Sequence, residues 1–125
     1  MSASYRDLRV WQQAMKLAVE IYRATEKFPR HEQYGLTSQI RRAAVSIASN
    51  IAEGKGRRTD REFSQFLYQA RGSLLEVETQ ILLSQELQYL SEPEAAALLK
   101  GATSVGRSLA GLINSLRPAT ASATR

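Results

Sequence analysis

Apolar residues recur at alternating steps of three and four through most of this 125-residue chain. That spacing is the period of one face of an α-helix. Four segments carry it, over residues 4–28, 36–54, 60–89 and 92–116, and no segment alternates apolar and polar residues as a half-buried strand does. Because the joining loops are short, the sequence predicts an all-α fold, an antiparallel up-down-up-down four-helix bundle that occupies residues 1–117 as one domain. Residues 118–125 are small and polar, and we expect a disordered tail there.

Capping signals set the predicted helix boundaries. Two capping boxes, Ser4–Asp7 and Thr59–Glu62, open the first and third helices, and a serine cap with a first-turn proline and two acids opens the fourth at Ser91. Pro29 is expected to end the first helix, because proline disfavours helical geometry in the residue before it. The second is expected to end at the segment Gly54-Lys55-Gly56, since glycine is the usual helix terminator.

The first and third helices carry apolar residues on more than one face. In the first, the expected core seam is Leu8, Trp11, Met15, Ala18, Tyr22 and Thr25, and further apolar residues lie off this seam. In the third helix, a second row of apolar residues lies beside the core stripe at seven-residue spacing: Tyr68, Leu75, Leu82 and Tyr89. A wide core stripe accounts for both surpluses, since each helix of a bundle touches two others. The alternative is a contact between subunits, and its expected residues are Val10, Leu17, Tyr68, Leu75, Leu82 and Tyr89.

The residues that catalysis requires do not occur at workable spacing, so we expect no enzyme. The single histidine, His31, excludes the Glu-x-x-His pairs of di-iron bundles, and the absence of cysteine excludes disulfides and thiolate metal sites. The segment Gly54–Gly56 follows a helix rather than a strand and is not a phosphate-binding loop. No cofactor and no metal is expected. The first residues lack an apolar leader and no stretch is long enough to span a bilayer, which predicts a cytoplasmic protein without membrane contact.

Positive charge is concentrated in one part of the chain. The formal net charge is +5 and the pI is near 9.9. Five basic residues and one acid lie between residues 35 and 58, whereas two basic residues and five acids lie between residues 59 and 90. Phosphates are a natural partner for such cations, although a solvated basic face is the plainer interpretation. The cations that could contact phosphates are Arg41, Arg42, Lys55, Arg57, Arg58 and Arg61.

These cations are not expected to form one patch, because Arg41 and Arg42 precede the others by about four helical turns. A separate set of residues is assigned a structural role on or beside the apolar stripes, namely Asn50, Glu53, Gly54 and Glu76. If their polar groups are buried they need partners, such as Arg57 or Arg42 for Glu53, and would fix helix register or assembly. Surface pairing of Glu53 with Arg57 is the alternative.

Several runs resemble one protein family. They are Tyr5–Gln12 (YRDLRVWQ), Phe28-Pro29, Tyr34–Leu36, Gln39–Gly54 (QIRRAAVSIASNIAEG), Phe66-Leu67 and Ala70–Gln80 (ARGSLLEVETQ). In this order they resemble the four-helix-bundle protein family of the 23S rRNA intervening-sequence type. The resemblance covers about residues 5–90, and the segment Asn50–Gly54 (NIAEG) is its most distinctive part.

The resemblance implies an assembly and a partner class. Members of that family form rings of five, and some are encoded inside insertions in ribosomal RNA genes. The similar accessory variability protein of diversity-generating retroelements binds nucleic acid and a reverse transcriptase through a basic surface. For this chain the resemblance implies a non-enzymatic homopentamer that binds RNA or DNA phosphates, with a reverse transcriptase as a partner by analogy only. The contacts that the resemblance implies are Arg41, Arg42, Lys55, Arg57, Arg58 and Arg71. The alternative is a protein-interaction scaffold, for which nucleic-acid binding is incidental.

Overall fold

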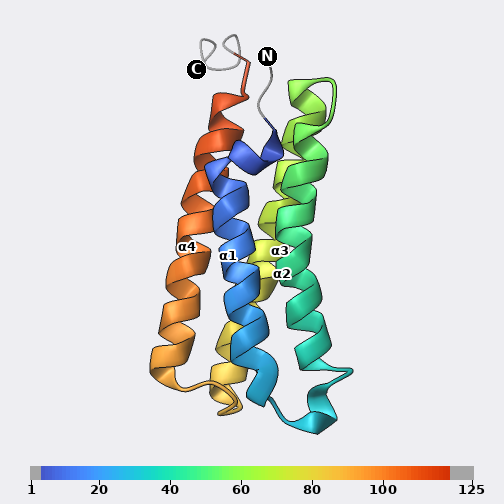
Figure 1. The fold of residues 1–125 in the computed structure, drawn as a ribbon. Helices are drawn as coiled ribbons and strands as arrows, with labels where there is room; N and C mark the ends of the chain where they lie inside the picture. The colour runs from blue at the N-terminus through green and yellow to red at the C-terminus, as the bar shows by residue number, and fades with distance from the viewer. Residues whose placement is uncertain (1–3, 119–125) are drawn as a thin grey trace.

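The computed structural model describes residues 4–118, and this part of the chain is an antiparallel bundle of four long helices (Figure 1). The helices are α1 (Arg9–Ala24), α2 (Leu36–Lys55), α3 (Asp60–Glu86) and α4 (Glu92–Ser115). Each packs against the next, and α4 closes the bundle against α1. Thus α1 and α3 occupy opposite corners. The predicted all-α up-down-up-down bundle is confirmed, whereas the predicted disordered tail lies, apart from Pro118, outside the described residues.

The first helix is shorter than the predicted span of 4–28. Ser4 caps a separate 3-10 turn, η1 (Tyr5–Asp7), where its Oγ accepts a hydrogen bond from the Arg6 N–H at 3.1 Å. Leu8 is extended, with ψ of 123°, so α1 begins only at Arg9. After Ala24 the chain tightens into η2 (Thr25–Lys27), and η3 (Arg30–Glu32) follows Pro29. The sequence marked the capped start correctly but gave no sign of the break at Leu8.

The third helix also ends earlier than predicted, at Glu86 instead of residue 89. Gln88 adopts a left-handed conformation with φ of 64°. This turns the chain, and the Tyr89 N–H then donates to the Ser84 carbonyl at 2.9 Å. Such a left-handed residue ends a helix by satisfying its last carbonyls, usually with glycine or asparagine in that place. Glutamine carries no such signal, which is why the sequence did not reveal the end.

The face that α1 turns to the core is only partly the one predicted. Val10, Leu17 and Ile21 are 4%, 1% and 0% exposed, so residues assigned to a subunit contact or left as surplus belong to the core. Of the expected seam, Ala18 and Thr25 are buried and Leu8 and Trp11 pack against the core, whereas Met15 and Tyr22 are 40% and 43% exposed. Both faces of α1 have helical spacing. The buried face is the one with Val10, Leu17 and Ile21, which points between α2 and α4. The prediction of Val10 and Leu17 as subunit contacts is therefore wrong.

The other three helices bury the stripes that the sequence predicts. All apolar members of the stripes are buried in α2 and α3, and in α4 from Ala95 to Leu109. At the end of α4, Leu112 and Leu116 pack on the core while remaining partly exposed, and Ile113 is buried in their place. Among the described residues, no helix has the length and apolarity needed to cross a bilayer.

The second helix ends within the predicted segment Gly54-Lys55-Gly56, one residue after the predicted boundary at residue 54. The helix continues through Lys55, and Gly56 is its C-cap with φ of −80°. Gly54 is buried, and a Cβ on it would lie 2.8 Å from Phe66 Cβ and 2.9 Å from Phe63 Cδ1. The requirement for glycine is therefore close approach to α3 and not backbone turning.

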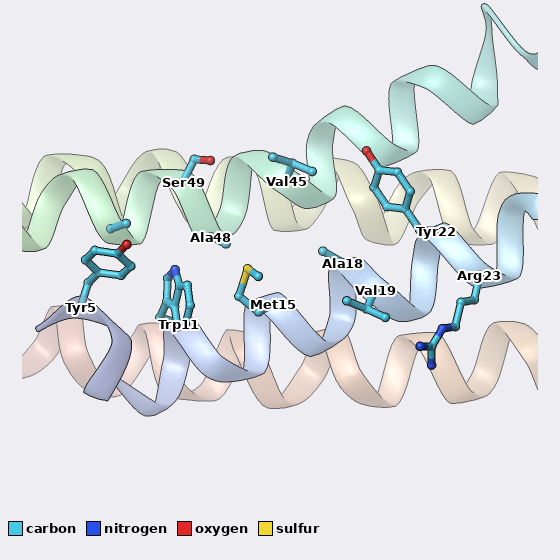
Figure 2. A pocket seen from close by; sticks show the side chains of 11 residues that line it. Tyr5, Trp11, Met15, Ala18, Val19, Tyr22, Arg23, Val45, Ala48 and Ser49 are labelled. Atoms are coloured by element: carbon cyan, nitrogen blue, oxygen red, sulfur yellow. The ribbon is translucent and has the colours of Figure 1, made fainter.

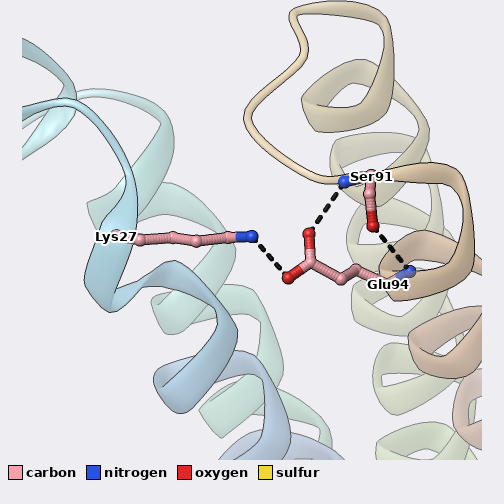
Figure 3. A network of polar contacts seen from close by, with 3 residues as sticks. All are labelled: Lys27, Ser91 and Glu94. Carbon is pink, nitrogen blue, oxygen red and sulfur yellow. Dashed lines mark hydrogen bonds and ion pairs between the residues drawn. The ribbon is translucent and has the colours of Figure 1, made fainter.

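An ion pair and a capping box join the end of α1 to the start of α4 (Figure 3). The Lys27 ammonium pairs with the Glu94 carboxylate, whose other oxygen accepts from the Ser91 N–H at 2.8 Å. The Ser91 hydroxyl accepts in return from the Glu94 N–H at 3.2 Å. The Lys27 hydrogen bond, followed by that of Ser91, lowers the pKa of Glu94 to about 2. This link closes the end of the bundle opposite the α2–α3 turn.

Candidate nucleic-acid interface

Four of the predicted cations lie at one end of the bundle, where α2 turns into α3. Lys55 is the last residue of α2, Arg57 and Arg58 lie in the turn, and Arg61 is in the first turn of α3. Thr59 fixes the start of α3, because its Oγ1 accepts a hydrogen bond from the Glu62 N–H at 3.1 Å. The turn thus places three arginines within five residues, all of them exposed.

A fifth cation, Arg117, joins them because the topology is antiparallel. The α2–α3 turn and the end of α4 lie at the same end of the bundle (Figure 1). Arg61 and Arg117 line one hollow of about 530 Å³ between the start of α3 and the end of α4. We call these five residues the basic end: Lys55, Arg57, Arg58, Arg61 and Arg117. Sequence reasoning missed Arg117, although the predicted up-down order already implies that residues near 61 and near 117 are neighbours.

Three carboxylates moderate the charge of the basic end. Glu53 Oε2 lies 3.8 Å from Arg57 Nη2, an i,i+4 pair on the surface, and Asp60 and Glu62 lie in the first turn of α3. Arg57 also stacks over Phe66, with 4.6 Å between its Cζ and the ring centroid. Five cations against three carboxylates leave an excess of positive charge. The amino end of α3 adds a partial positive charge of its own.

Arg41 has a structural task. Its Nε donates to Thr25 Oγ1 at 2.9 Å, and its Nη2 donates to the Tyr22 carbonyl at 3.1 Å. Its guanidinium lies over the Tyr22 ring at 4.7 Å from the centroid. Arg41 therefore satisfies carbonyl and hydroxyl groups at the end of α1, and much of its donor capacity is occupied within the chain.

Arg42 and Arg71 lie apart from the basic end. Arg42 precedes Lys55 by thirteen residues on α2, which is about 20 Å along a helix. It lines a hollow with Tyr34, whose side chain is 90% exposed, and with Glu76. Arg71 is exposed on α3 and lies over the Tyr68 ring at 5.1 Å from the centroid. The seven predicted cations are thus divided among separate places. Sequence reasoning missed Tyr34, an aromatic side chain in a polar loop beside an arginine.

The predicted structural polar residues divide into two kinds. Asn50 Nδ2 donates to the carbonyl and to Oγ of Ser46, at 2.9 and 3.0 Å, and Ser46 Oγ lies 2.9 Å from Ser73 Oγ. This half-buried chain of hydrogen bonds joins α2 to α3. Glu53 and Glu76 are exposed instead, and Glu76 accepts from Gln80 Nε2 at 3.4 Å. The surface alternative holds for these two carboxylates.

The seven-residue row of α3 is exposed for most of its length. Tyr68, Leu75 and Leu82 are 44%, 57% and 51% exposed. Tyr89 lies beyond the helix, half-buried, and its hydroxyl donates to Glu32 Oε2 at 2.9 Å. That bond raises the pKa of Tyr89, and the pKa of Glu32 is lowered, first by the Leu36 N–H and then by the Tyr89 hydroxyl. Tyr89 therefore fixes the α1–α2 loop and does not extend the exposed row.

His31 lies in the α1–α2 loop, beside Tyr89. His31 is largely exposed, and its Nε2 lies 3.4 Å from the Tyr89 hydroxyl. Over residues 4–118, no three His, Cys, Asp or Glu side chains come together as metal ligands would.

The family model of the 23S rRNA-intervening sequence protein matches residues 6–111 of this chain. The chain belongs to this family. The match includes α1, α2, α3 and most of α4. It therefore extends beyond residues 5–90, which carry the resemblance described above.

A solved structure has the same bundle. It is the 1.70 Å crystal structure of a protein with unknown function from the S23 ribosomal protein family of Bacteroides thetaiotaomicron VPI-5482, to which this chain is similar with a TM-score of 0.75. The two are 21% identical, and the alignment covers 83% of this chain and 97% of the other. At that identity the likeness establishes the fold. No curated protein matches the chain.

Proposed function

We propose that this 23S rRNA-intervening sequence protein is a non-enzymatic homo-oligomer, a pentamer, that binds the phosphates of RNA or DNA. The basic end is the observation that carries the proposal: Lys55, Arg57, Arg58 and Arg61 of the α2–α3 turn and Arg117 after α4 gather at one end of the bundle from two segments of the chain. Cations that reach phosphates give affinity without reading bases. The family name, which refers to ribosomal RNA, agrees with this partner class.

Assembly multiplies the weak charge of a single basic end. One chain offers an excess of only two positive charges there, which would bind a polyanion poorly. Copies related by rotation about an axis parallel to the bundle would carry their basic ends on the same side of a ring. One nucleic-acid strand would then contact several copies at once, and linked contacts raise the overall affinity well above that of one site.

Paired arginine substitutions test the proposal. We expect Arg57→Ala/Arg58→Ala to weaken binding of a fluorescent single-stranded RNA and of a duplex DNA by at least tenfold at low salt, because phosphate contacts are lost. The matched control is Arg30→Ala/Lys100→Ala, which removes the same charge from exposed positions away from the basic end. Equal losses from both variants would reduce the effect to net charge, and unchanged binding by the first would contradict the proposed site.

A protein-interaction scaffold is the second candidate, and the exposed apolar surfaces of α1 and α3 favour it. A partner bound as protein, including a reverse transcriptase by analogy with the accessory variability protein, would remain on the purified protein after nuclease treatment. Partners held through nucleic acid would be lost. Affinity purification with and without nuclease therefore separates the two functions.

A further inference from the structure

An apolar groove runs along the outer side of α1 and α2 (Figure 2). Its volume is about 500 Å³. The walls are half-exposed apolar side chains of α1, and the floor consists of alanines from both helices. Within the groove lining the only charged side chain is Arg23. The lining residues that carry the argument are Trp11, Met15, Val19, Tyr22, Val45 and Ala48.

The shape and lining of the groove are those of a surface that binds a helix. Trp11, Met15, Ala18 and Tyr22 follow one another at steps of four, three and four, the spacing of a coiled-coil seam. Ala18 and Ala48 are 8% and 5% exposed and leave depth between the larger side chains. A contiguous exposed apolar surface of this kind marks an interaction site.

The same chain carries a matching ridge on α3. Tyr68, Leu75 and Leu82 stand exposed at seven-residue spacing, and Gly72 lies between the first two. A Cβ on Gly72 would meet no atom within 4 Å. A glycine inside an exposed helix costs about 1 kcal/mol relative to alanine, and no neighbour among residues 4–118 requires a glycine at this position. A backbone approaching from outside does supply a reason.

Length, direction and charge of the two surfaces agree. The ridge spans fifteen residues (68–82) and the α1 wall twelve (11–22), so the first and last residues lie roughly 21 and 17 Å apart along their helices. Both α1 and α3 run in the same direction (Figure 1), so rotation about an axis parallel to the bundle lays the ridge of one copy parallel to the groove of another. Arg23 then lies at the same end as Glu86, one turn beyond Leu82 on the ridge.

We infer that the α3 ridge of one copy docks in the α1–α2 groove of a second copy. The inference rests on the proposed assembly and not on nucleic-acid binding. Because groove and ridge are different surfaces at different corners of the bundle, the contact is heterologous. Each copy uses its groove for one neighbour and its ridge for the other, which generates a ring or a filament and not a two-fold dimer.

Cysteine cross-linking tests this pairing without background, because the chain has no cysteine. Leu75→Cys is combined in turn with Met15→Cys, Val19→Cys and Tyr22→Cys, and each purified protein is oxidised and run on a denaturing gel. A disulfide within one chain is excluded because α1 and α3 occupy opposite corners. We expect at least one pair to give a ladder that continues beyond dimer.

The controls separate this contact from others. Met15→Cys with Gln69→Cys, an exposed residue of α3 off the ridge, should not give a ladder. Cross-linking by Met15→Cys alone would indicate groove-to-groove contact and overturn the inference. If light scattering shows an oligomer and none of the three pairs cross-links, the inference fails while the assembly stands. A monomer overturns both, whereas a ladder from protein that does not bind RNA refutes only nucleic-acid binding.

A glycine pair gives an independent readout. Gly72→Gln adds a side chain where the chain itself leaves open space, so the bundle should fold while its mass by light scattering falls to that of a monomer. Gly111, on α4, has the same open surroundings. Gly111→Gln should retain the full assembly. Retention of the oligomer by Gly72→Gln would contradict docking at the ridge.

Discussion

Gly54 and Arg41 each have a structural role that their residue type alone does not indicate. Gly54 lets α2 come within contact of Phe63 and Phe66, while Arg41 satisfies acceptors at the end of α1. In the sequence, Gly54 belongs to the segment expected to end α2, and Arg41 is a candidate phosphate contact. Their structural roles were not predicted, because in each case the contacting residues belong to another helix.

Substitution of Gly54 by alanine should lower the free energy of unfolding by roughly 1–3 kcal/mol, since the added methyl group meets two phenylalanines at under 3 Å. This loss outweighs the gain of up to about 1 kcal/mol from alanine's higher helix propensity. Urea unfolding at fixed protein concentration measures it. Gly111→Ala, which meets no neighbour, is the control and should be stabilising; equal stability of the two variants would refute the close α2–α3 approach.

Arg41→Ala should destabilise the bundle more than Arg42→Ala does. Removal of Arg41 leaves Thr25 Oγ1 and the Tyr22 carbonyl without this donor, a loss of about 1–2 kcal/mol. Arg42 is exposed and makes no such bonds among the described residues, so its loss should change the free energy of unfolding by less than about 0.5 kcal/mol. Thermal unfolding of both proteins provides the comparison. A larger loss for Arg42→Ala would contradict the structural role of Arg41.

At the scale of helices, the apolar period predicted that four helices exist and in which order they follow. It did not always predict which face of a helix is buried. The stripes of α2 and α3 lie where expected because each of those helices has one dominant apolar face. In α1, the seam with Trp11 and Met15 and the face with Val10 and Leu17 have the same period, and the sequence gives no basis for choosing between them. Burial follows from the position of α4, which only the assembled bundle reveals.

The link between α1 and α4 should weaken in acid. The pKa of Glu94 is lowered to about 2 from an ordinary value of 4.5, so its contribution to stability is complete above pH 4.5 and is lost as the pH falls toward 2. Glu94→Gln should therefore lower the melting temperature at pH 7, and this difference should shrink across that window.

Glu92→Gln is the matched control for this prediction. Glu92 shares the first turn of α4 but forms no ion pair within residues 4–118. Its substitution removes the same charge from the helix end without breaking the Lys27 contact. A difference between Glu94→Gln and the unsubstituted protein that persists undiminished at pH 2 would show that the carboxylate charge is not what stabilises this end.

At the scale of the molecule, the sequence predicted the bundle and the cations at the α2–α3 turn. Helical period and capping residues are local properties, and Arg57 and Arg58 are neighbours in sequence as well as in space. Arg117 was missed because its place beside Arg61 depends on how the chain returns. The groove was missed because the side chains of its α1 wall had been assigned to the core.

The proposed function depends most on whether the basic end binds phosphates. The decisive measurement is the affinity for a fluorescent single-stranded RNA over a range of salt concentrations. We expect log K to fall linearly with log salt, with a slope near −0.7 for each phosphate contacted, and a shallower slope for Arg57→Ala/Arg58→Ala. An affinity indifferent to salt, or the same slope for both proteins, would contradict binding at this end of the bundle.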